Sequence, residues 1–244
     1  ALMLGHTQVL LCGSGGLEER LSLLLDGNRI SPGCRLVCAE DAAAVLEESG
    51  AGLETALTRM EAGGALYAPT VSDTLSDLLG ASGMAVVPYV SGSDLTMAVA
   101  DARGRIRTTL SQAACRGIAL MRGTPRDTVL AVQAEGRTLS YVLHSCRFRL
   151  SLETDNGLTA VLSFRITGEC PEAQDQAQLR RGVQEAVTAL CQAAVLETVC
   201  AYGVDLLDFE RAAQHTDPAF FAAHAQEWNA VIAQAGFRCE VRIG

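Results

Sequence analysis

The sequence predicts an α+β fold, in which an N-terminal α/β unit is followed by an antiparallel sheet backed by helices. Three observations predict it. Strand and helix signals alternate over the first ninety residues, apolar and polar residues alternate along 146–166, and helical spacing of apolar residues follows from 173. With 244 residues, 49% of them hydrophobic, the chain is long enough for one large domain or two modest ones.

The first part of the chain begins with a short apolar run at 6–12, which a glycine-rich turn separates from a helix at 17–25. The pattern then predicts, in order, a strand at 34–38, helices at 41–48, 53–61 and 71–79, and a strand at 84–90. Thr70 or Ser72 is the expected cap of the third of these helices.

The strand and helix alternation ends at Ser91-Gly92-Ser93, where flexible residues cluster. We therefore predict two separable units, an N-terminal α/β domain at 1–92 and a C-terminal α+β domain at 93–244. The second unit is expected to open with strands at 95–100 and 105–109 and a helix at 111–121.

The strongest local signal is a long antiparallel hairpin. Apolar and polar residues alternate on both sides of Asn156-Gly157, a dipeptide that favours a type I′ turn. The strands are expected at 146–152 and 158–166, with one face buried.

Helices and one more strand follow the hairpin. Apolar spacing predicts a long amphipathic helix over 173–202, and Asp217-Pro218 supplies an N-cap with proline at the first helical position. The helix that begins there carries an apolar stripe, which we expect to pack on the hairpin sheet: Phe221, Ala225, Trp228 and Ile232. Gly236 ends it, and 237–243 alternates as a terminal strand.

The charge balance is acidic, with a formal net charge of -9 and a pI near 4.9, and argues against a nucleic-acid partner. No apolar run approaches the roughly 20 residues that span a bilayer. The nine cysteines are scattered and odd in number, so we interpret them as buried free thiols. Cys34 and Cys38 are the one close pair, and a strand between them would hold them apart.

One loop resembles a nucleotide-binding turn. Gly13-Ser14-Gly15-Gly16 follows a strand and opens a helix, and Glu40 or Asp41 stands where a ribose-binding carboxylate would lie. The third glycine of that fingerprint falls on Glu18, whose charge would repel a pyrophosphate. A plain strand-to-helix turn is the favoured interpretation, and a nucleotide-binding enzyme is the alternative.

No other pattern indicates chemistry. The histidines show no metal-ligand spacing, and no serine stands in a nucleophile elbow. Asp208 and Glu210 precede His215, but two positions apart on a helix they would diverge. The sequence therefore predicts no catalytic residue, no cofactor and no metal.

The C-terminal residues carry a resemblance to a known family. The run Asp205-Leu206-Leu207-Asp208-Phe209-Glu210, then Pro218, Phe221 and Trp228, and a last strand closing on Gly244, resembles the end of Ger(x)C spore germination proteins. That family shows an Asp-apolar-aromatic-Gly-Phe-Gly run, then a proline and two tryptophans. Trp228 matches the second tryptophan, while Asp208 and Glu210 replace the glycines and Phe221 replaces the first tryptophan.

Two further stretches agree with this resemblance. Residues 98–118 are similar to a segment in which an Ala-Val-Phe run precedes a short helix that a glycine terminates, here Gly117. Residues 6–40 are similar to the strand, helix and strand that follow a Ser-His motif. The motif residues that the resemblance singles out are Asp205, Phe209, Pro218 and Trp228.

The resemblance implies a non-enzymatic lipoprotein on the outer face of the spore inner membrane. Such a protein is exported and assembles with polytopic A and B subunits into a nutrient-germinant receptor. Its lipid anchor is an N-terminal cysteine in a lipobox, which the present 244 residues do not contain. The N-terminal domain is accordingly expected to be shorter than that of the family.

Overall fold

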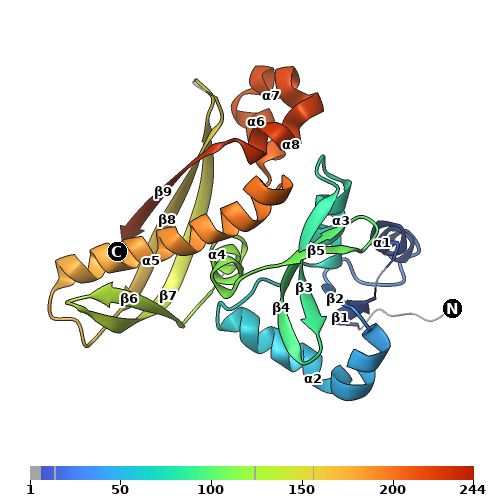
Figure 1. Cartoon of the computed structure of the whole chain (residues 1–244), viewed down its shortest axis with the longest axis horizontal. Coiled ribbons are helices and arrows are strands. Elements are labelled where there is room, and N and C mark those ends of the chain that lie inside the picture. The colour runs from blue at the N-terminus through green and yellow to red at the C-terminus, as the bar shows by residue number, and fades with distance from the viewer. Residues whose placement is uncertain (1–6, 14, 124, 156) are drawn as a thin grey trace.

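Two mixed β-sheets organise the chain in the computed structural model, which describes residues 7–13, 15–123, 125–155 and 157–244 (Figure 1). The first sheet has the strand order β1-β2-β3-β4-β5 and the second β6-β7-β8-β9. Helices pack on both faces of the first sheet and on one face of the second. The α+β class is therefore confirmed.

The first sheet contains both parallel and antiparallel strands. Its parallel strands are β1 (Val9–Cys12), β2 (Arg35–Ala39) and β3 (Met84–Ser91), and the antiparallel ones are β4 (Asp94–Asp101) and β5 (Ile106–Thr109). Three helices accompany them: α1 (Leu17–Asp26), α2 (Ala42–Ala62) and α3 (Val71–Leu79). Helices α1 and α3 bury Leu21 and Val71 with Leu36 on one face, whereas α2 buries Leu57 with Val37 on the other.

Helix α2 differs from its prediction, because the helices expected at 41–48 and 53–61 form one continuous helix. The Asp41 carboxylate caps it by accepting from the N–H groups of Ala43 and Ala44, both at 3.0 Å. Each helical glycine costs about 1 kcal/mol. Burial of Leu53 and Leu57 on the same face offsets that cost, so the helix runs through the glycines at 50 and 52.

The boundary predicted at residues 92 and 93 falls within a tight hairpin. β3 and β4 pair in register from Met84 with Asp101 to Ser91 with Asp94, so Gly92-Ser93 is a turn inside one sheet. A boundary that leaves each sheet whole lies between Thr109 and Thr128. That the chain consists of two separable units stays a prediction.

The second sheet is built on the predicted hairpin. Its strands are β6 (Thr128–Ala134), β7 (Arg137–Glu153), β8 (Thr159–Glu169) and β9 (Gly236–Ile243). β7 and β8 pair antiparallel up to Glu153 with Thr159, as the alternation predicts, while Asn156 of the predicted turn lies outside the described residues. β9 joins β8 in parallel. β6 was not predicted, although Leu130 and Val132 alternate with exposed residues along it.

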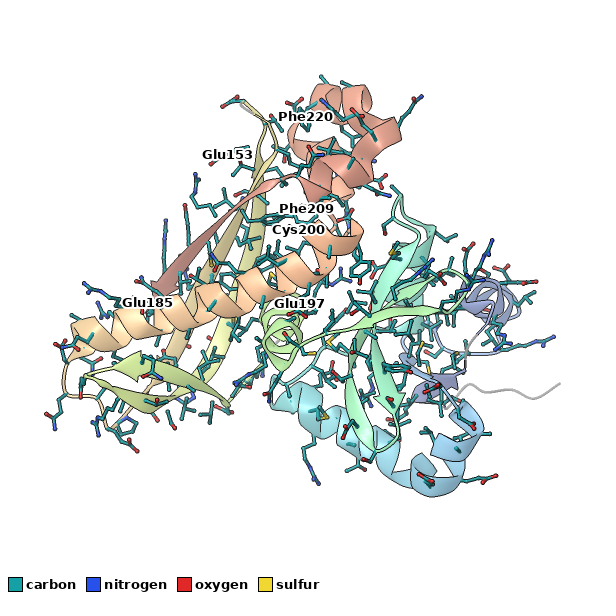
Figure 2. The ribbon with its side chains drawn as sticks, in the orientation of Figure 1. Glu153, Glu185, Glu197, Cys200, Phe209 and Phe220 are labelled. Carbon is teal, nitrogen blue, oxygen red and sulfur yellow. The ribbon has the colours of Figure 1, made fainter. Side chains whose placement is uncertain are left out.

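Helix α5 (Gln176–Val195) lies across one face of this sheet and continues into a π-helical turn, Leu196–Cys200 (Figure 1). Helix α4 (Gln112–Arg122) packs against α5 between the two sheets. The carboxylate of Glu197 accepts from the Ser111 N–H at 2.8 Å, which fixes the start of α4 beside the end of α5 (Figure 2).

Short helices cap the hairpin end of the second sheet. They are α6 (Phe209–Thr216), α7 (Pro218–His224), a 3₁₀ turn (Ala225–Glu227) and α8 (Trp228–Ala233). One helix was predicted for the last three. Nδ1 of His224 lies 2.9 Å from the Phe220 carbonyl oxygen, a side-chain contact that competes with helical pairing where α7 ends. Helix α8 contacts the π turn and α7, and its Trp228 and Ile232 belong to the same buried core as the inner face of the second sheet.

One hydrophobic core continues from the α2 face of the first sheet, through α4, to the second sheet. All nine cysteines are free, and six are buried: Cys12, Cys34, Cys38, Cys115, Cys170 and Cys191. Over the described ranges, no helix has the length and apolar character required to cross a bilayer.

Candidate functional site

The predicted motif residue Asp205 holds the entry to α6. Its carboxylate accepts from the backbone N–H groups of Phe209 at 2.5 Å and Glu210 at 3.0 Å. Asp208, which lies between Asp205 and Phe209 in the sequence, has a left-handed backbone with φ 57°. Glycine adopts that conformation most readily, and aspartate is among the few other residues that visit it. Asp208, at a position where the resemblance expects glycine, therefore adopts a backbone conformation that glycine favours.

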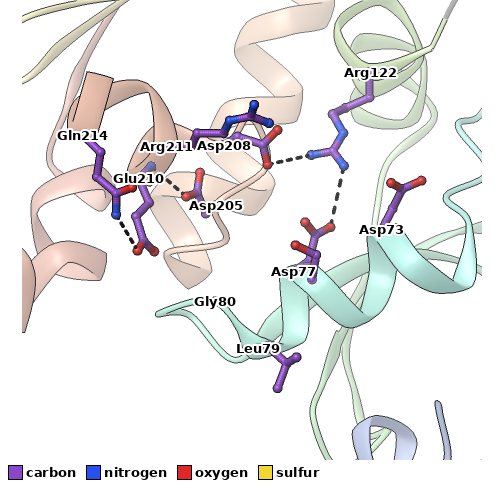
Figure 3. A pocket seen from close by; sticks show the side chains of 11 residues that line it. Asp73, Asp77, Leu79, Gly80, Arg122, Asp205, Asp208, Glu210, Arg211 and Gln214 are labelled. Carbon is purple, nitrogen blue, oxygen red and sulfur yellow. Dashed lines mark hydrogen bonds and ion pairs between the residues drawn. The ribbon is translucent and has the colours of Figure 1, made fainter. Parts of the chain in front are cut away.

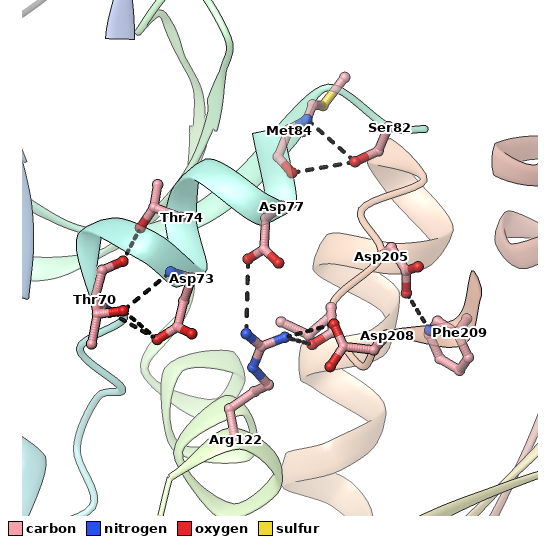
Figure 4. A network of polar contacts seen from close by, with 11 residues as sticks. Thr70, Asp73, Thr74, Asp77, Ser82, Met84, Arg122, Asp205, Asp208 and Phe209 are labelled. Carbon is pink, nitrogen blue, oxygen red and sulfur yellow. Dashed lines mark hydrogen bonds and ion pairs between the residues drawn. The ribbon is translucent and has the colours of Figure 1, made fainter. Parts of the chain in front are cut away.

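Arg122, the last residue of α4, joins this segment to the first sheet's helices (Figure 4). Its Nη1 donates to the Leu206 carbonyl oxygen over 2.6 Å. The Nη atoms also lie 3.9 Å from the carboxylates of Asp77 on α3 and Asp208. The guanidinium carbon is 5.4 Å from the centroid of the Tyr67 ring, a cation–π distance.

A cavity of about 480 Å³ opens between α3 and α6 beside this network (Figure 3). Its walls carry five carboxylates and two guanidinium groups. The lining residues are Asp73, Ser76, Asp77, Leu79, Gly80, Arg122, Asp205, Asp208, Glu210, Arg211 and Gln214. The cavity thus lies where the two halves of the chain meet, and charged side chains from both halves face it.

Burial controls the ionisation of the inner carboxyl groups. Burial raises the pKa of Asp77 to about 7, with Asp208 and Asp205 adding to the increase and Arg122 opposing it. Burial also raises the pKa of Asp205, against the lowering effect of its two backbone hydrogen bonds. Near neutral pH, Asp77 is therefore only partly ionised beside Arg122.

The contacts around Arg122 join separate elements of the chain. Among the described residues, no group of three or more His, Cys, Asp and Glu side chains could hold a metal ion. Arg122 and Asp205 are committed to backbone groups of the segment before α6 and of its first turn. The physical role that this geometry supports is the fixing of α3, α4 and α6 relative to one another.

The other predicted motif residues build the helical cap. Phe209 is fully buried, and Pro218 occupies the first turn of α7, where the Asp217 carboxylate accepts from Phe220 N–H at 2.9 Å. Trp228 is 1% exposed and meets the Phe221 ring edge-on at 5.1 Å. The structure brings Asp205 to the cavity and places Phe209 and Trp228 in the adjoining core, whereas Pro218 is exposed at the start of α7.

The sequence alone did not indicate Arg122, Asp77 or Tyr67. They lie on separate elements, far apart in the chain. The sequence around each of them does not distinguish it from an ordinary surface residue. The only local signal is that Arg122 ends an amphipathic helix after an apolar run, where a cation also complements the helix dipole.

The glycine-rich loop does not have the setting of a nucleotide site. The strands β1, β2 and β3 follow one another in sequence order, so this part of the sheet has no switch point at which a ligand crevice would form. The N–H of Glu18 in the first turn of α1 donates to Ala102 O at 3.0 Å. Gly104, in the same turn between β4 and β5 as Ala102, packs against Gly15. Ser14 lies outside the described residues.

No protein-family model matches the chain, and no curated protein matches it in sequence. Among solved structures, the crystal structure of the GerBC protein matches with a TM-score of 0.74. The match covers 98% of this chain and 78% of that chain, at 11% sequence identity. The chain has the fold of GerBC. The predicted Ger(x)C-type fold is thereby confirmed, and it extends over both sheets.

The GerBC-like fold contains a close helix crossing at one of the resembling stretches. Gly117 of α4 faces α5, and a Cβ atom there would lie 2.1 Å from the Leu190 carbonyl oxygen. Only glycine permits this approach. The glycine that the family resemblance placed at the end of a short helix lies inside α4 and has a packing role there.

Proposed function

We propose that this chain is the C subunit of a spore nutrient-germinant receptor, a non-enzymatic protein that acts through protein contacts. The observation that carries the proposal is the likeness of its fold to GerBC over 98% of the chain. The resemblance around Asp205, Pro218 and Trp228 supports the same assignment from the sequence side.

In this proposal the chain lies at the outer face of the spore inner membrane and assembles there with the A and B membrane subunits. A lipid attached N-terminal to Ala1 anchors it, as the resemblance to Ger(x)C lipoproteins implies. Stable anchoring requires more than one acyl chain or a second membrane contact. The cluster around Arg122 maintains the shape of the subunit that its partners contact.

Deletion of the full-length gene tests the proposal. We expect spores that form normally but respond poorly to nutrient germinants, with recovery when the intact gene is returned. A copy in which the anchoring cysteine is replaced by alanine should not restore the response. In fractionated spores, the intact protein should sediment with membranes together with its A and B partners.

Two results would contradict the proposal. One is a normal nutrient response in the deletion strain and in strains lacking related genes as well. The other is a full-length product that carries no lipid and fractionates away from spore membranes.

The nucleotide-binding alternative has a direct test of its own. A ligand at one hundred times its dissociation constant stabilises a folded protein by about 2.7 kcal/mol. We expect no change in Tm with ATP or NAD. A rise that disappears in Gly15→Val would instead favour the enzyme interpretation.

A further inference from the structure

The second sheet leaves one of its faces exposed. Helix α5 lies across the face that buries Phe164 and Ile166 (Figure 1). Alternate residues along β7, β8 and β9 point to the opposite face, because side chains alternate along a strand. We call this surface the arginine face. Its exposed or half-exposed residues are Ser145, Arg147, Arg149, Ser151, Glu153, Thr159, Ser163, Arg165, Thr167, Glu169, Arg238, Glu240 and Arg242.

Three arginines stand in line across this face. Arg147 of β7 is paired in register with Arg165 of β8, which is paired with Arg242 of β9. Adjacent strands are about 4.8 Å apart, so the row spans roughly 10 Å. Arg149 lies two residues further along β7, on the same face.

The row has no internal counter-charge. Among the described residues, none of Arg147, Arg165 and Arg242 has a carboxylate within 4.0 Å. The neighbouring Arg238 pairs with Glu153 at 2.6 Å and with Glu240 at 3.5 Å. Like charges directly opposite one another destabilise a sheet, so the row costs stability in the isolated chain.

The charge of this row is also opposite in sign to the net charge of the chain. The chain has a formal net charge of -9, yet this face gathers unpaired positive charge. Hydroxyl groups adjoin the row, with Ser145 and Thr167 side chains 2.7 Å apart. Guanidinium forks and hydroxyl groups together suit phosphate oxygens, which arginine binds in a bidentate manner.

We propose that the arginine face binds an anionic phospholipid surface, with the row of three arginines contacting lipid phosphates. Most exposed side chains of this face are arginine, serine, threonine and glutamate, and none is aromatic; its apolar residues are the half-exposed Val142, which pairs with Glu169, and the buried Val161. Protein interfaces are enriched in aromatic anchors, which favours a headgroup surface here over an acidic protein. Anionic membranes attract basic patches through the same electrostatics.

The inference rests on the proposed function, because it says which face of a membrane-bound subunit lies against the membrane. Its test is separate, because vesicle binding by the isolated chain does not depend on germination. Loss of binding with a normal germination phenotype, or the reverse, identifies which of the two proposals fails.

The experiment measures cosedimentation of the 244-residue chain with vesicles of equal parts phosphatidylglycerol and phosphatidylcholine, and with phosphatidylcholine alone. We expect binding only to the anionic vesicles, weakening as salt is raised. The variant Arg147→Gln/Arg165→Gln/Arg242→Gln should bind at least about tenfold more weakly, since each arginine near such a surface contributes measurably.

A matched control removes the same charge elsewhere. Arg20→Gln/Arg59→Gln/Arg181→Gln alters three exposed arginines on α1, α2 and α5 and should retain binding within about twofold of the unmodified chain. Thermal unfolding of both variants checks folding. The face variant should melt no lower than the parent, because it removes repulsion between like charges.

Three outcomes overturn the proposal. The chain does not bind anionic vesicles, or both triple variants lose binding equally, or the chain binds polyglutamate and leaves the vesicles unbound. The second outcome would attribute binding to overall charge, and the third would identify an acidic protein as the partner.

Discussion

The guanidinium of Arg122 donates to the carbonyl oxygen of Leu206 over 2.6 Å, across 84 residues of sequence. This bond ties the end of α4 to the segment that enters α6. Because Asp77 lies 3.9 Å from the same guanidinium, one side chain connects the first sheet's α3 with the helical cap of the second. Arg122 is therefore one polar link between the two sheets, in addition to the hydrophobic core that they share.

We expect Arg122→Met to lower the free energy of unfolding by about 2 to 3 kcal/mol. The change keeps the apolar stem but leaves the Leu206 carbonyl and the half-buried Asp77 without their partner, and hydrogen bonds to charged groups contribute about 1.5–3 kcal/mol. Urea unfolding measures it. Arg126→Met, at an exposed arginine in the following loop, is the control and should change stability by under about 0.5 kcal/mol. Equal effects in the two variants would contradict the role of Arg122.

The raised pKa of Asp77 predicts a pH dependence of stability. The folded pKa of about 7 lies above the ordinary aspartate value, so the folded state binds the extra proton between about pH 4 and 7. The contribution of Asp77 to folding stability must therefore fall as pH rises through that window and level off above about 7. Asp73, Asp205 and Asp208 face the same site, and Arg122 opposes them.

Replacing Asp77 by asparagine isolates this contribution. Relative to the parent, Asp77→Asn should gain stability on going from pH 4 to pH 8, by up to about 4 kcal/mol. Urea unfolding at several pH values gives the difference between the two proteins. Asp26→Asn, at an exposed position on α1, provides the charge-matched control. A difference between parent and Asp77→Asn that stays constant with pH would show that Asp77 titrates normally.

The crossing of α4 and α5 depends on Gly117. We expect Gly117→Ala to destabilise the protein by about 3 kcal/mol, since its Cβ would lie 2.1 Å from the Leu190 carbonyl oxygen and force the helices apart. Gly52→Ala is a control of opposite sign. No heavy atom lies within 4 Å of a Cβ at Gly52, so the alanine should stabilise α2 by about 0.5–1 kcal/mol. Thermal melts of both variants distinguish packing from helix propensity, because propensity alone would stabilise both.

The elements that the sequence predicts well are those with local signals. Helix α3 has the expected bounds because Thr70 and Asp73 form a capping box, and the β7–β8 hairpin follows from strict alternation. Asp217 caps α7 with Pro218 in its first turn, as expected. In these cases a few neighbouring residues determine the backbone.

The parts that could not be predicted depend on contacts between distant segments. Gly92-Ser93 reads as a linker, but full pairing of β3 with β4 makes it a turn. The Arg122 cluster joins residues 45 to 86 positions apart, and no spacing rule relates them. The arginine face appears only when β7, β8 and β9 align in register. Tertiary pairing, which periodicity does not record, creates each of these features.

Cys239 of β9 is expected to be the most reactive thiol of the protein. The neighbouring Cys191 thiol stabilises the Cys239 thiolate and, together with the Thr188 side chain, lowers its pKa to about 7, although burial opposes the change. The ordinary value is about 8.5, and the thiolate is the nucleophile. Alkylation by iodoacetamide should therefore rise through about pH 7 and reach a plateau above it. Cys38, whose pKa burial raises to about 12, should stay unlabelled while the protein is folded.

Peptide mass spectrometry of native protein labelled between pH 5 and 9 gives the midpoint for Cys239. In Cys191→Ala the stabilising donor is gone, so the midpoint should move upward and labelling at pH 7 should slow by severalfold. Cys34→Ala removes a buried thiol directly before β2 of the first sheet and should leave the pH dependence of Cys239 labelling unchanged. A midpoint near 8.5 in the parent, or one unmoved by Cys191→Ala, would mean that the Cys191 thiol does not hold the Cys239 thiolate.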